Sequence, residues 1–393
     1  MDKLVYQGGA VLTKAQVQPI FWGSSWTDSA NSQAANALVS DLTVLFAGPY
    51  MLGLQQYSGI GPATILPPVY DPWTDPPASM SVAELGTYIE TLLTAGRVAD
   101  IDDNNQILYF VITNGSALSD VADALGIHKL ATTRQGRRFH FAWTSYAWSL
   151  TASHEIVEAC TDADGDGWFQ GMIEAVDICQ KTPGYYGDCE GVMAGLYWSN
   201  KDSDCIRPRR VAKIDAHTAP ADGCIIGPTV GSETRFIVSS IDMVPGWIDA
   251  SNLAPLGPLQ YAWKFNTQNA FASSATDGPE LVLNWIKGAP TGVLASVTIT
   301  SQATGAKISG SYTGSINGQI QADMRLGICR FRKTLDGINR RPPFLIDRFG
   351  PDPAPILTAR EVEELKAYAM SLSSQAEHLS KTFELLQEVD LEE

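Results

Sequence analysis

Six consecutive residues combine side chains that bind metal ions with side chains that move protons. They are Ser153-His154-Glu155-Ile156-Val157-Glu158. His154 and Glu158 are four residues apart, so on a helix they share one face and can bind one ion. Glu155 follows His154 and lies about 100° round the helix, where it can take a proton from an ion-bound water. The segment therefore predicts a metal site with Glu155 as its catalytic base.

The spacing corresponds to the His-Glu-x-x-His helix of zinc peptidases, with Glu158 in place of the second histidine. Glu174 and Asp177 lie downstream of this segment, and one of them would supply the third metal ligand. A carboxylate is a harder ligand than an imidazole. The glutamate therefore weakens the case for zinc and leaves room for manganese or calcium. We expect a divalent metal, with zinc favoured and calcium as an alternative. The competing interpretation is a hydrogen-bonded network on an amphipathic helix, with no ion.

A second acidic segment follows the helix. Asp162, Asp164 and Asp166 precede Gly167, which is how a calcium loop begins, with ligands at positions 1, 3 and 5 and a glycine at 6. Position 12 of such a loop is Ile173, and a glutamate arrives one residue late. The segment thus predicts either a calcium site or an acidic turn.

The other histidines give weaker signals. His140 lies in a strand-like run and is expected to be a buried histidine with satisfied hydrogen bonds. His128 has no acidic neighbour in the sequence that would orient its ring, so no role is predicted for it.

Six cysteines are too few for a small disulfide scaffold, and no Cys-x-x-Cys pair points to a zinc ribbon. Four cysteines fall within one segment, and we expect one or two disulfides among them. Reduced, buried cysteines are the alternative. The four candidates are Cys179, Cys189, Cys205 and Cys224.

The net charge of −16 argues against binding to nucleic acid or to an anionic membrane surface, because phosphate contacts need clustered cations. No run of 18 uncharged apolar residues occurs, so no membrane span is expected. Residues 1–9 lack the apolar core of a signal peptide.

The elements around the His-Glu helix mix strands with helices. Residues 16–22 and the continuous apolar run 107–113 predict strands, the second buried on both faces, and 139–143 predicts an edge or second strand. Residues 31–46 have helical spacing, and Ser81 to Glu84 form a capping box that opens another helix. The predicted fold class is α+β, with a zincin-like layered α/β N-terminal domain, a β-rich second domain and a long C-terminal helix.

The predicted domains follow the changes in composition. Residues 1–225 form the zincin-like domain, and 226–345 form the β-rich domain, with short strands at 297–300, 306–311 and 320–324. A proline-rich linker spans 346–357. Residues 358–393 form an amphipathic helix with leucines at every seventh position, which predicts either a homo-oligomer through a coiled coil or packing on the chain's own domains.

Several segments together resemble the EXORDIUM (phosphate-induced protein) family of plants and its bacterial relatives, over residues 5–210. The matching pieces are Tyr6 to Thr13, Ile20 to Gly23, the Ser153 to Glu158 helix with Thr161, Asp162 and Trp168, Glu174-x-x-Asp177-x-Cys179, and Tyr197 to Asn200 with Cys205. The resemblance implies an extracellular protein, and it makes His154, Glu155, Glu158, Glu174 and Asp177 the family's polar signature.

The function predicted from these patterns is a metal-dependent hydrolase of the zinc metallopeptidase type, acting on a peptide or protein substrate. The alternative is a non-catalytic extracellular binding or assembly protein, with a structural ion and helix-mediated oligomerisation.

Overall fold

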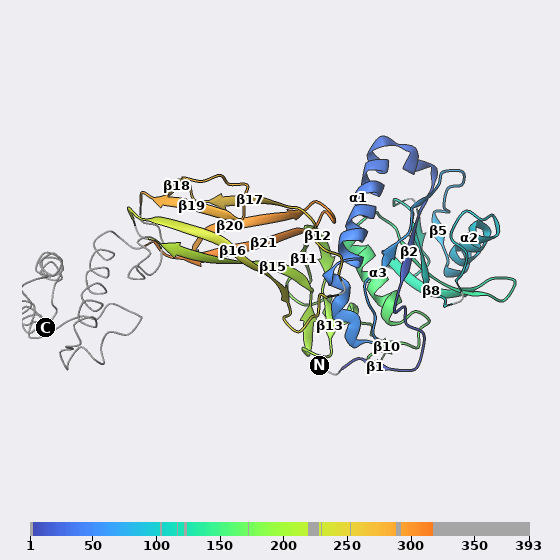
Figure 1. Ribbon diagram of the computed structural model, residues 1–393. Coiled ribbons are helices and arrows are strands. Elements are labelled where there is room, and N and C mark those ends of the chain that lie inside the picture. The colour runs from blue at the N-terminus through green and yellow to red at the C-terminus, as the bar shows by residue number, and fades with distance from the viewer. Residues whose placement is uncertain are drawn as a thin grey trace, which may run out of the picture. The chain divides into compact units, whose positions relative to one another are not determined.

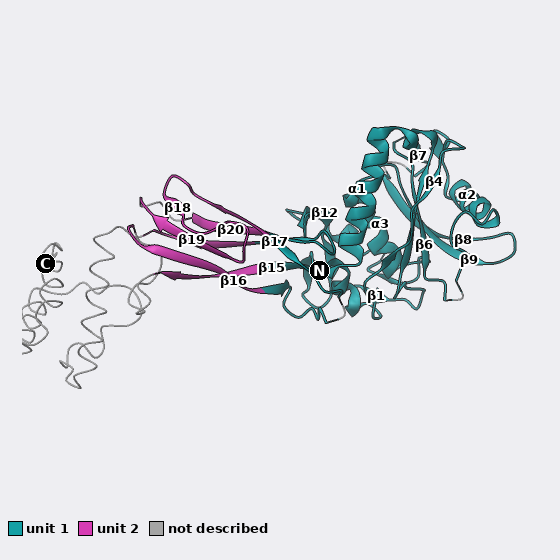
Figure 2. Cartoon of the chain, turned by 45° about the horizontal axis from the view of Figure 1, so that its top comes forward, with its two compact units in different colours: residues 1–211, 241–260, 299–309 teal, residues 212–240, 261–298, 310–393 magenta. Residues whose placement is uncertain are grey.

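The computed structural model describes residues 3–316, except 103, 116, 122–123, 172, 219–227, 229, 252 and 288–291. The chain divides into two compact units (Figure 2). The first unit contains the described residues of 1–211, 241–260 and 299–309, and the second those of 212–240, 261–298 and 310–393. The predicted strand at 320–324, the linker 346–357 and the helix 358–393 lie outside the described residues.

A six-stranded sheet forms the centre of the first unit (Figure 1). Its strands are β2 (Gln16–Trp22), β3 (Thr64–Ile65), β4 (Val69–Asp71), β6 (Ile107–Ile112), β8 (Gly126–Thr132) and β9 (Arg138–Thr144). The order is β3-β2-β6-β9-β8, with β4 also paired to β2. Strands β2, β6 and β9 are parallel, and β8 runs antiparallel to β9. Strand β8 therefore ends this sheet in the part of the chain that the structure describes.

Strand β6 confirms the prediction of a central strand, because all six of its residues are buried. Its side chains alternate between two cores. Leu108 and Phe110 face one core, and Tyr109 and Val111 face the other. Strand β9 pairs with β6 on one side and β8 on the other, so the segment near 139–143 is an interior strand.

Helices cover both faces of this sheet (Figure 1). Helices α1 (Ser29–Phe46) and α3 (Ser149–Thr161) pack on the face that contains Phe110, and α2 (Val82–Thr94) packs on the opposite face. Helix α2 begins as predicted: the Glu84 amide donates to Ser81 Oγ at 3.2 Å, and the Ser81 amide donates to Glu84 Oε2 at 2.7 Å.

The N-terminal segment is held by residues much later in the sequence. Strand β1 (Val5–Tyr6) pairs with β10 (Trp168–Phe169). Asn200 binds both polar groups of the Leu4 backbone: the Leu4 amide donates to Asn200 Oδ1, and Asn200 Nδ2 donates to the Leu4 carbonyl, both at 2.8 Å.

Short elements complete the first unit. They are the 3-10 helices η1 (Ser24–Thr27), η2 (Pro49–Gln56) and η3 (Asp177–Cys179) and the strands β5 (Ser79–Met80), β7 (Leu118–Ser119), β11 (Tyr186–Cys189), β12 (Val192–Gly195), β13 (Tyr197–Ser199) and β14 (Asp204–Ile206). A disulfide between Cys179 and Cys205 joins η3 to β14, which confirms that a disulfide forms in this segment. Cys160 and Cys189 are free and buried, and Cys224 lies outside the described residues.

A seven-stranded sheet supplies most of the second unit, in the order β17-β20-β21-β15-β16-β19-β18. Its strands are β15 (Arg209–Thr218), β16 (Glu233–Val244), β17 (Leu259–Phe265), β18 (Ala270–Ala272), β19 (Glu280–Trp285), β20 (Gly292–Ser301) and β21 (Lys307–Gly314). The strands predicted at 297–300 and 306–311 correspond to β20 and β21. The Phe236 ring makes edge contacts with Trp285 and Tyr312, and Trp285 Nε1 donates to Thr234 Oγ1 at 2.9 Å.

The predicted fold class, α+β with a zincin-like layered α/β N-terminal domain, is wrong. Strands hold 38% of the described residues and helices only 20%. Part of this excess of strand over helix comes from the long strands β15 and β16 and from the small sheets β11-β12 and β13-β14. The prediction rests on the alternation of strand-like and helical segments, followed by the His-Glu helix. Short strands paired across long stretches of sequence leave no comparable local pattern.

Across the described residues, no single helix has both the length and the apolar composition to cross a membrane. Helices α1 and η2 meet both criteria only when taken together, and they are bent by 46° relative to each other.

Candidate metal and catalytic site

Helix α3 presents three polar side chains of the predicted site. Its apolar residues Ala152, Ile156 and Ala159 recur at helical spacing and are buried in the core beneath the sheet. The helix also packs against β8 and β9. His154, Glu155 and Glu158 consequently line a single pocket at the β8 edge of the sheet.

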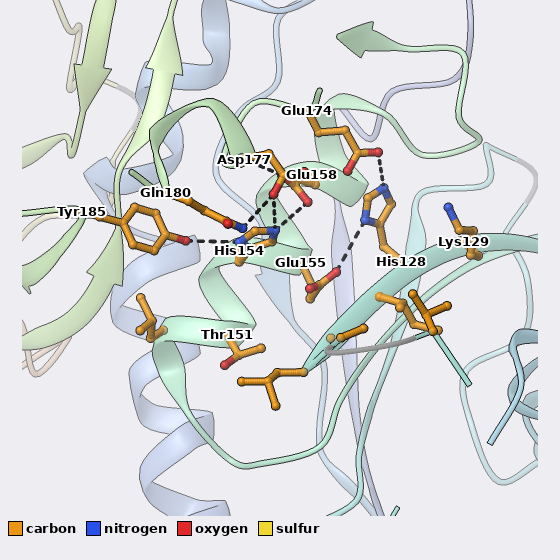
Figure 3. A pocket seen from close by; sticks show the side chains of 16 residues that line it. His128, Lys129, Thr151, His154, Glu155, Glu158, Glu174, Asp177, Gln180 and Tyr185 are labelled. Carbon is orange, nitrogen blue, oxygen red and sulfur yellow. Dashed lines mark hydrogen bonds and ion pairs between the residues drawn. The ribbon is translucent and has the colours of Figure 1, made fainter. Parts of the chain in front are cut away.

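The pocket has a volume of about 510 Å³ and lies within the first unit (Figure 3). Strand β8 and the residues before it form one wall, and α3 forms another. The segment around η3 contributes Glu174, Asp177 and Gln180, and Tyr185 follows it. The structure thus brings together all five predicted catalytic and metal-binding residues: His154, Glu155, Glu158, Glu174 and Asp177.

The first group of metal donors surrounds His154. Its Nε2 atom lies 2.9 Å from Glu158 Oε2 and 3.5 Å from Asp177 Oδ1, and one donor atom from each residue lies within 4.8 Å of the others. On the other side of the ring, His154 Nδ1 lies 3.2 Å from the Tyr185 hydroxyl. With Nδ1 protonated and donating to Tyr185, Nε2 is free to bind a metal ion.

Hydrogen bonds from the backbone fix the orientation of the Glu158 carboxylate. Its Oε1 atom accepts hydrogen bonds from the amides of Val176 and Asp177, each at 3.2 Å, and its side chain is almost fully buried. These bonds leave Oε2 directed towards His154.

The second group of donors contains His128, which lies on β8. Its Nε2 atom is 3.5 Å from Glu174 Oε1, and its Nδ1 atom is 3.6 Å from Glu155 Oε2. His128, Glu158 and Glu174 can also bring one donor atom each within 4.8 Å of one another. Glu158 therefore belongs to both groups.

Electrostatics in the pocket favour bound cations. Burial lowers the pKa of His154, but the charge and hydrogen bond of Glu158 and the charges of Glu155 and Asp177 together outweigh it and raise that pKa to about 9. For His128, burial again lowers the pKa, and contacts with Glu155 and Glu174 outweigh it and raise the pKa well above its usual value. Burial raises the pKa of Glu158 and of Asp177. Each imidazole therefore holds a positive charge strongly when no metal ion competes for it.

Glu155 fills the space between α3 and β8. A side-chain carbon at Gly126 would lie 2.4 Å from Glu155 Oε1. The glycine at the start of β8 therefore leaves the room that the carboxylate occupies. Glu155 is buried, and it still lines the pocket.

The candidate calcium residues Asp162, Asp164 and Asp166 lie apart from this pocket. Asp162 Oδ1 accepts from the Gly167 amide at 2.6 Å. Asp164 accepts from the Ala10 amide at 2.9 Å and pairs with Arg138 at 3.1 Å. Among the described residues, neither group of cation donors includes them. The observed bonds fasten the acidic turn to the N-terminal segment and to β9.

His128 is the site residue that sequence reasoning missed. Its acidic partners come from α3 and from the loop before η3, so nothing next to it in the sequence reveals them. His140, in contrast, has the satisfied and buried environment predicted for it: Nδ1 lies 3.1 Å from the Ala163 carbonyl and Nε2 2.8 Å from Asn105 Nδ2. The only sign that His128 has a role is its polar ring, which the structure places at a buried position of strand β8.

No family model matches the chain, and no curated protein matches it. The resemblance to the EXORDIUM family stays a prediction.

Proposed function

We propose that this pocket binds a divalent metal ion through His154, Glu158 and Asp177 and hydrolyses peptide bonds, with Glu155 as the general base. Zinc is the favoured ion because imidazole and carboxylate are both zinc ligands, and the second carboxylate also makes the set suitable for manganese.

The separation of the donor atoms is the observation that carries the proposal. Ligands bound to a tetrahedral ion at 2.0–2.1 Å lie about 3.3 Å from each other. His154 Nε2 is 3.5 Å from Asp177 Oδ1, close to that value, and 2.9 Å from Glu158 Oε2, the length of a direct ion pair that a bound ion would replace. Three protein ligands in an open pocket leave a coordination position for water or substrate, which a catalytic site requires.

Glu155 is the proposed base because it follows a ligand on the same helix and faces the same pocket. A divalent ion bound there would polarise a substrate carbonyl and lower the pKa of a bound water. Glu155 would accept the proton of that water and pass it to the leaving amine.

The proposed substrate is an extended peptide, because β8 forms a wall of the pocket. It pairs with β9 along its full length, and no other described strand pairs with its outer edge. An extended peptide can add to such an edge through backbone hydrogen bonds, whatever its sequence. This would place a peptide bond beside α3.

The decisive experiment compares the wild type with Glu155→Gln, after removal of bound metal and reloading with Zn²⁺. We expect the variant to retain the metal and to hydrolyse a mixture of unstructured peptides roughly 10² to 10⁴ times more slowly, because its amide cannot accept a proton. Metal content is measured by elemental analysis and cleavage by mass spectrometry.

Glu280→Gln is the matched control, since it changes a surface ion pair with Arg235 in the second unit and should leave hydrolysis unaltered. Equal activity in Glu155→Gln and the wild type would exclude the general-base role. A zinc-loaded wild type that cleaves none of the peptides would refute the peptidase proposal.

A further inference from the structure

The two groups of donors in the pocket meet at one residue. His154 and Asp177 form the first group with Glu158, and His128 and Glu174 form the second group with the same Glu158. Each group contains one imidazole and two carboxylates. A single ion explains the first group and leaves the second unexplained.

Distances in the second group are unusual for direct ion pairs. Hydrogen bonds between a charged imidazole and a carboxylate are typically 2.7–2.9 Å long. The two contacts of His128 measure 3.5 Å to Glu174 and 3.6 Å to Glu155. The contact with Glu174 instead suits two neighbouring ligands of one tetrahedral ion, for which about 3.3 Å is expected.

The charge of the pocket points in the same direction. Four carboxylates line it, from Glu155, Glu158, Glu174 and Asp177, and Lys129 is the only lysine or arginine among its described lining residues. Glu155 and Glu158 are buried, and buried carboxylates need paired charges because their desolvation is unfavourable. When both imidazoles are neutral metal ligands, one divalent ion offsets two of the four carboxylate charges, and a second offsets the other two.

We propose that the pocket binds two divalent cations, with Glu158 as the carboxylate shared between them. The first ion is the one in the proposed function, on which this inference rests, and the second is held by His128 and Glu174. Glu155 then has a further role, because its contact with His128 Nδ1 keeps the other ring nitrogen, Nε2, directed at Glu174 and the second ion. Paired ions of this kind act together on the attacking and leaving groups of a hydrolysis.

The test counts the ions in the full chain. Protein freed of metal is titrated with Mn²⁺, and bound Mn²⁺ is followed by electron paramagnetic resonance. Zn²⁺ is counted by elemental analysis after dialysis. We expect two ions per chain in the wild type, with exchange coupling between two bound Mn²⁺ ions. Stoichiometry should fall from two to one in His128→Asn and in Asp177→Asn.

His217→Asn is the matched control, because His217 is exposed on β15 and its loss should leave two ions bound. Circular dichroism checks that each variant is folded. Glu174→Gln replaces His128→Asn if the latter unfolds, since the Glu174 side chain is partly exposed and tolerates exchange.

The outcomes separate this inference from the proposed function. One ion in the wild type, retained in His128→Asn and lost in Asp177→Asn, would overturn the second ion and leave the proposed function intact. One ion lost in His128→Asn and retained in Asp177→Asn would overturn both the pair of ions and the first set of ligands. No bound ion in the wild type would overturn both proposals together.

Discussion

Glu155 depends on a residue that has no side chain. Its carboxylate lies against Gly126 at the start of β8, and the same carboxylate contacts His128 two residues further along that strand. The proposed base is therefore positioned by β8 as much as by its own helix. A change on the strand should alter its position without touching any metal ligand of α3.

Gly126→Ala is expected to reduce hydrolysis by at least roughly 10-fold and to leave the first metal ion bound. The added carbon would lie 2.4 Å from Glu155 Oε1 and 2.6 Å from its Cγ, so the carboxylate must move. Steady-state cleavage of the best peptide substrate and metal analysis of the same sample measure both effects.

Gly278→Ala provides the control, since no atom lies within 4 Å of a side-chain carbon placed there. Full activity in Gly126→Ala would show that Glu155 keeps its function after displacement, and its role as a positioned base would be refuted.

Most of the candidate site could be predicted from spacing alone. His154, Glu155 and Glu158 follow from the helical repeat, and Glu174 and Asp177 can be found because they follow the helix closely. His128 could not be found this way, because its partners are brought to it by the pairing of β8 with β9 and the packing of α3 on that pair. Local patterns report the face of an element, and they do not report what a neighbouring element places opposite that face.

At the scale of elements, η3 connects the metal site to the disulfide. This single turn begins at Asp177 and ends at Cys179, and Cys179 is bonded to Cys205 on β14. The amide of Asp177 also donates to Glu158. The disulfide therefore restrains one proposed ligand directly and a second one through that hydrogen bond.

Replacing both cysteines, as Cys179→Ser with Cys205→Ser, is expected to lower the free energy of unfolding by about 3 kcal/mol, given the 26 residues between them. That corresponds to a fall in Tm of roughly 10 °C. Metal affinity should also fall, because Asp177 is then free to move away from His154. Calorimetry and a zinc competition titration measure the two effects.

Cys189→Ala controls for the loss of a buried thiol outside any disulfide. It should cost less stability and leave zinc affinity unchanged. If the double variant binds zinc as tightly as the wild type, η3 is held by other contacts and the disulfide has no part in the site.

Elements with a strong local signal were predicted well. The apolar run of β6, the spacing of α1 and the capping box of α2 all fall where expected. Of the two alternatives for residues 139–143, an edge or a second strand, the edge is excluded because β9 pairs with β6 and with β8. The zincin-like fold was inferred from alternating strands and helices around the His-Glu helix, and it failed because strands hold 38% of the described residues and helices only 20%.

At the scale of the whole molecule, sequence order and spatial grouping differ. The first unit takes in residues 241–260 and 299–309, far beyond the segment that contains its sheet and its pocket. Composition changes gradually along the chain, so it cannot show that the polypeptide returns to a unit it has left. The N-terminal segment shows the same principle, since its partners are β10 and Asn200.

Asn200→Ala should lower the free energy of unfolding by about 1 to 3 kcal/mol, because two backbone groups of Leu4 lose their partner. The Trp198 indole also loses an acceptor. Thermal unfolding measures the loss, and hydrogen exchange at Leu4 should become faster.

Gln33→Ala, at an exposed position of α1, is the control and should leave stability equal or slightly higher, since alanine favours helix. Unchanged exchange at Leu4 in Asn200→Ala would mean that β1 and β10 alone hold the segment.

The bond between Leu4 and Asn200 also has a consequence for synthesis. The two residues are 196 positions apart, and a ribosome adds about 5 to 20 residues per second. Leu4 is therefore made about 10 to 40 s before the residue that binds it. Strands β2, β6 and β9 are all translated within that interval. Docking of Leu4 is thus a late event in the synthesis of this protein, and a chain arrested between residues 169 and 200 could pair β1 with β10 but would lack the two bonds that Asn200 makes to Leu4.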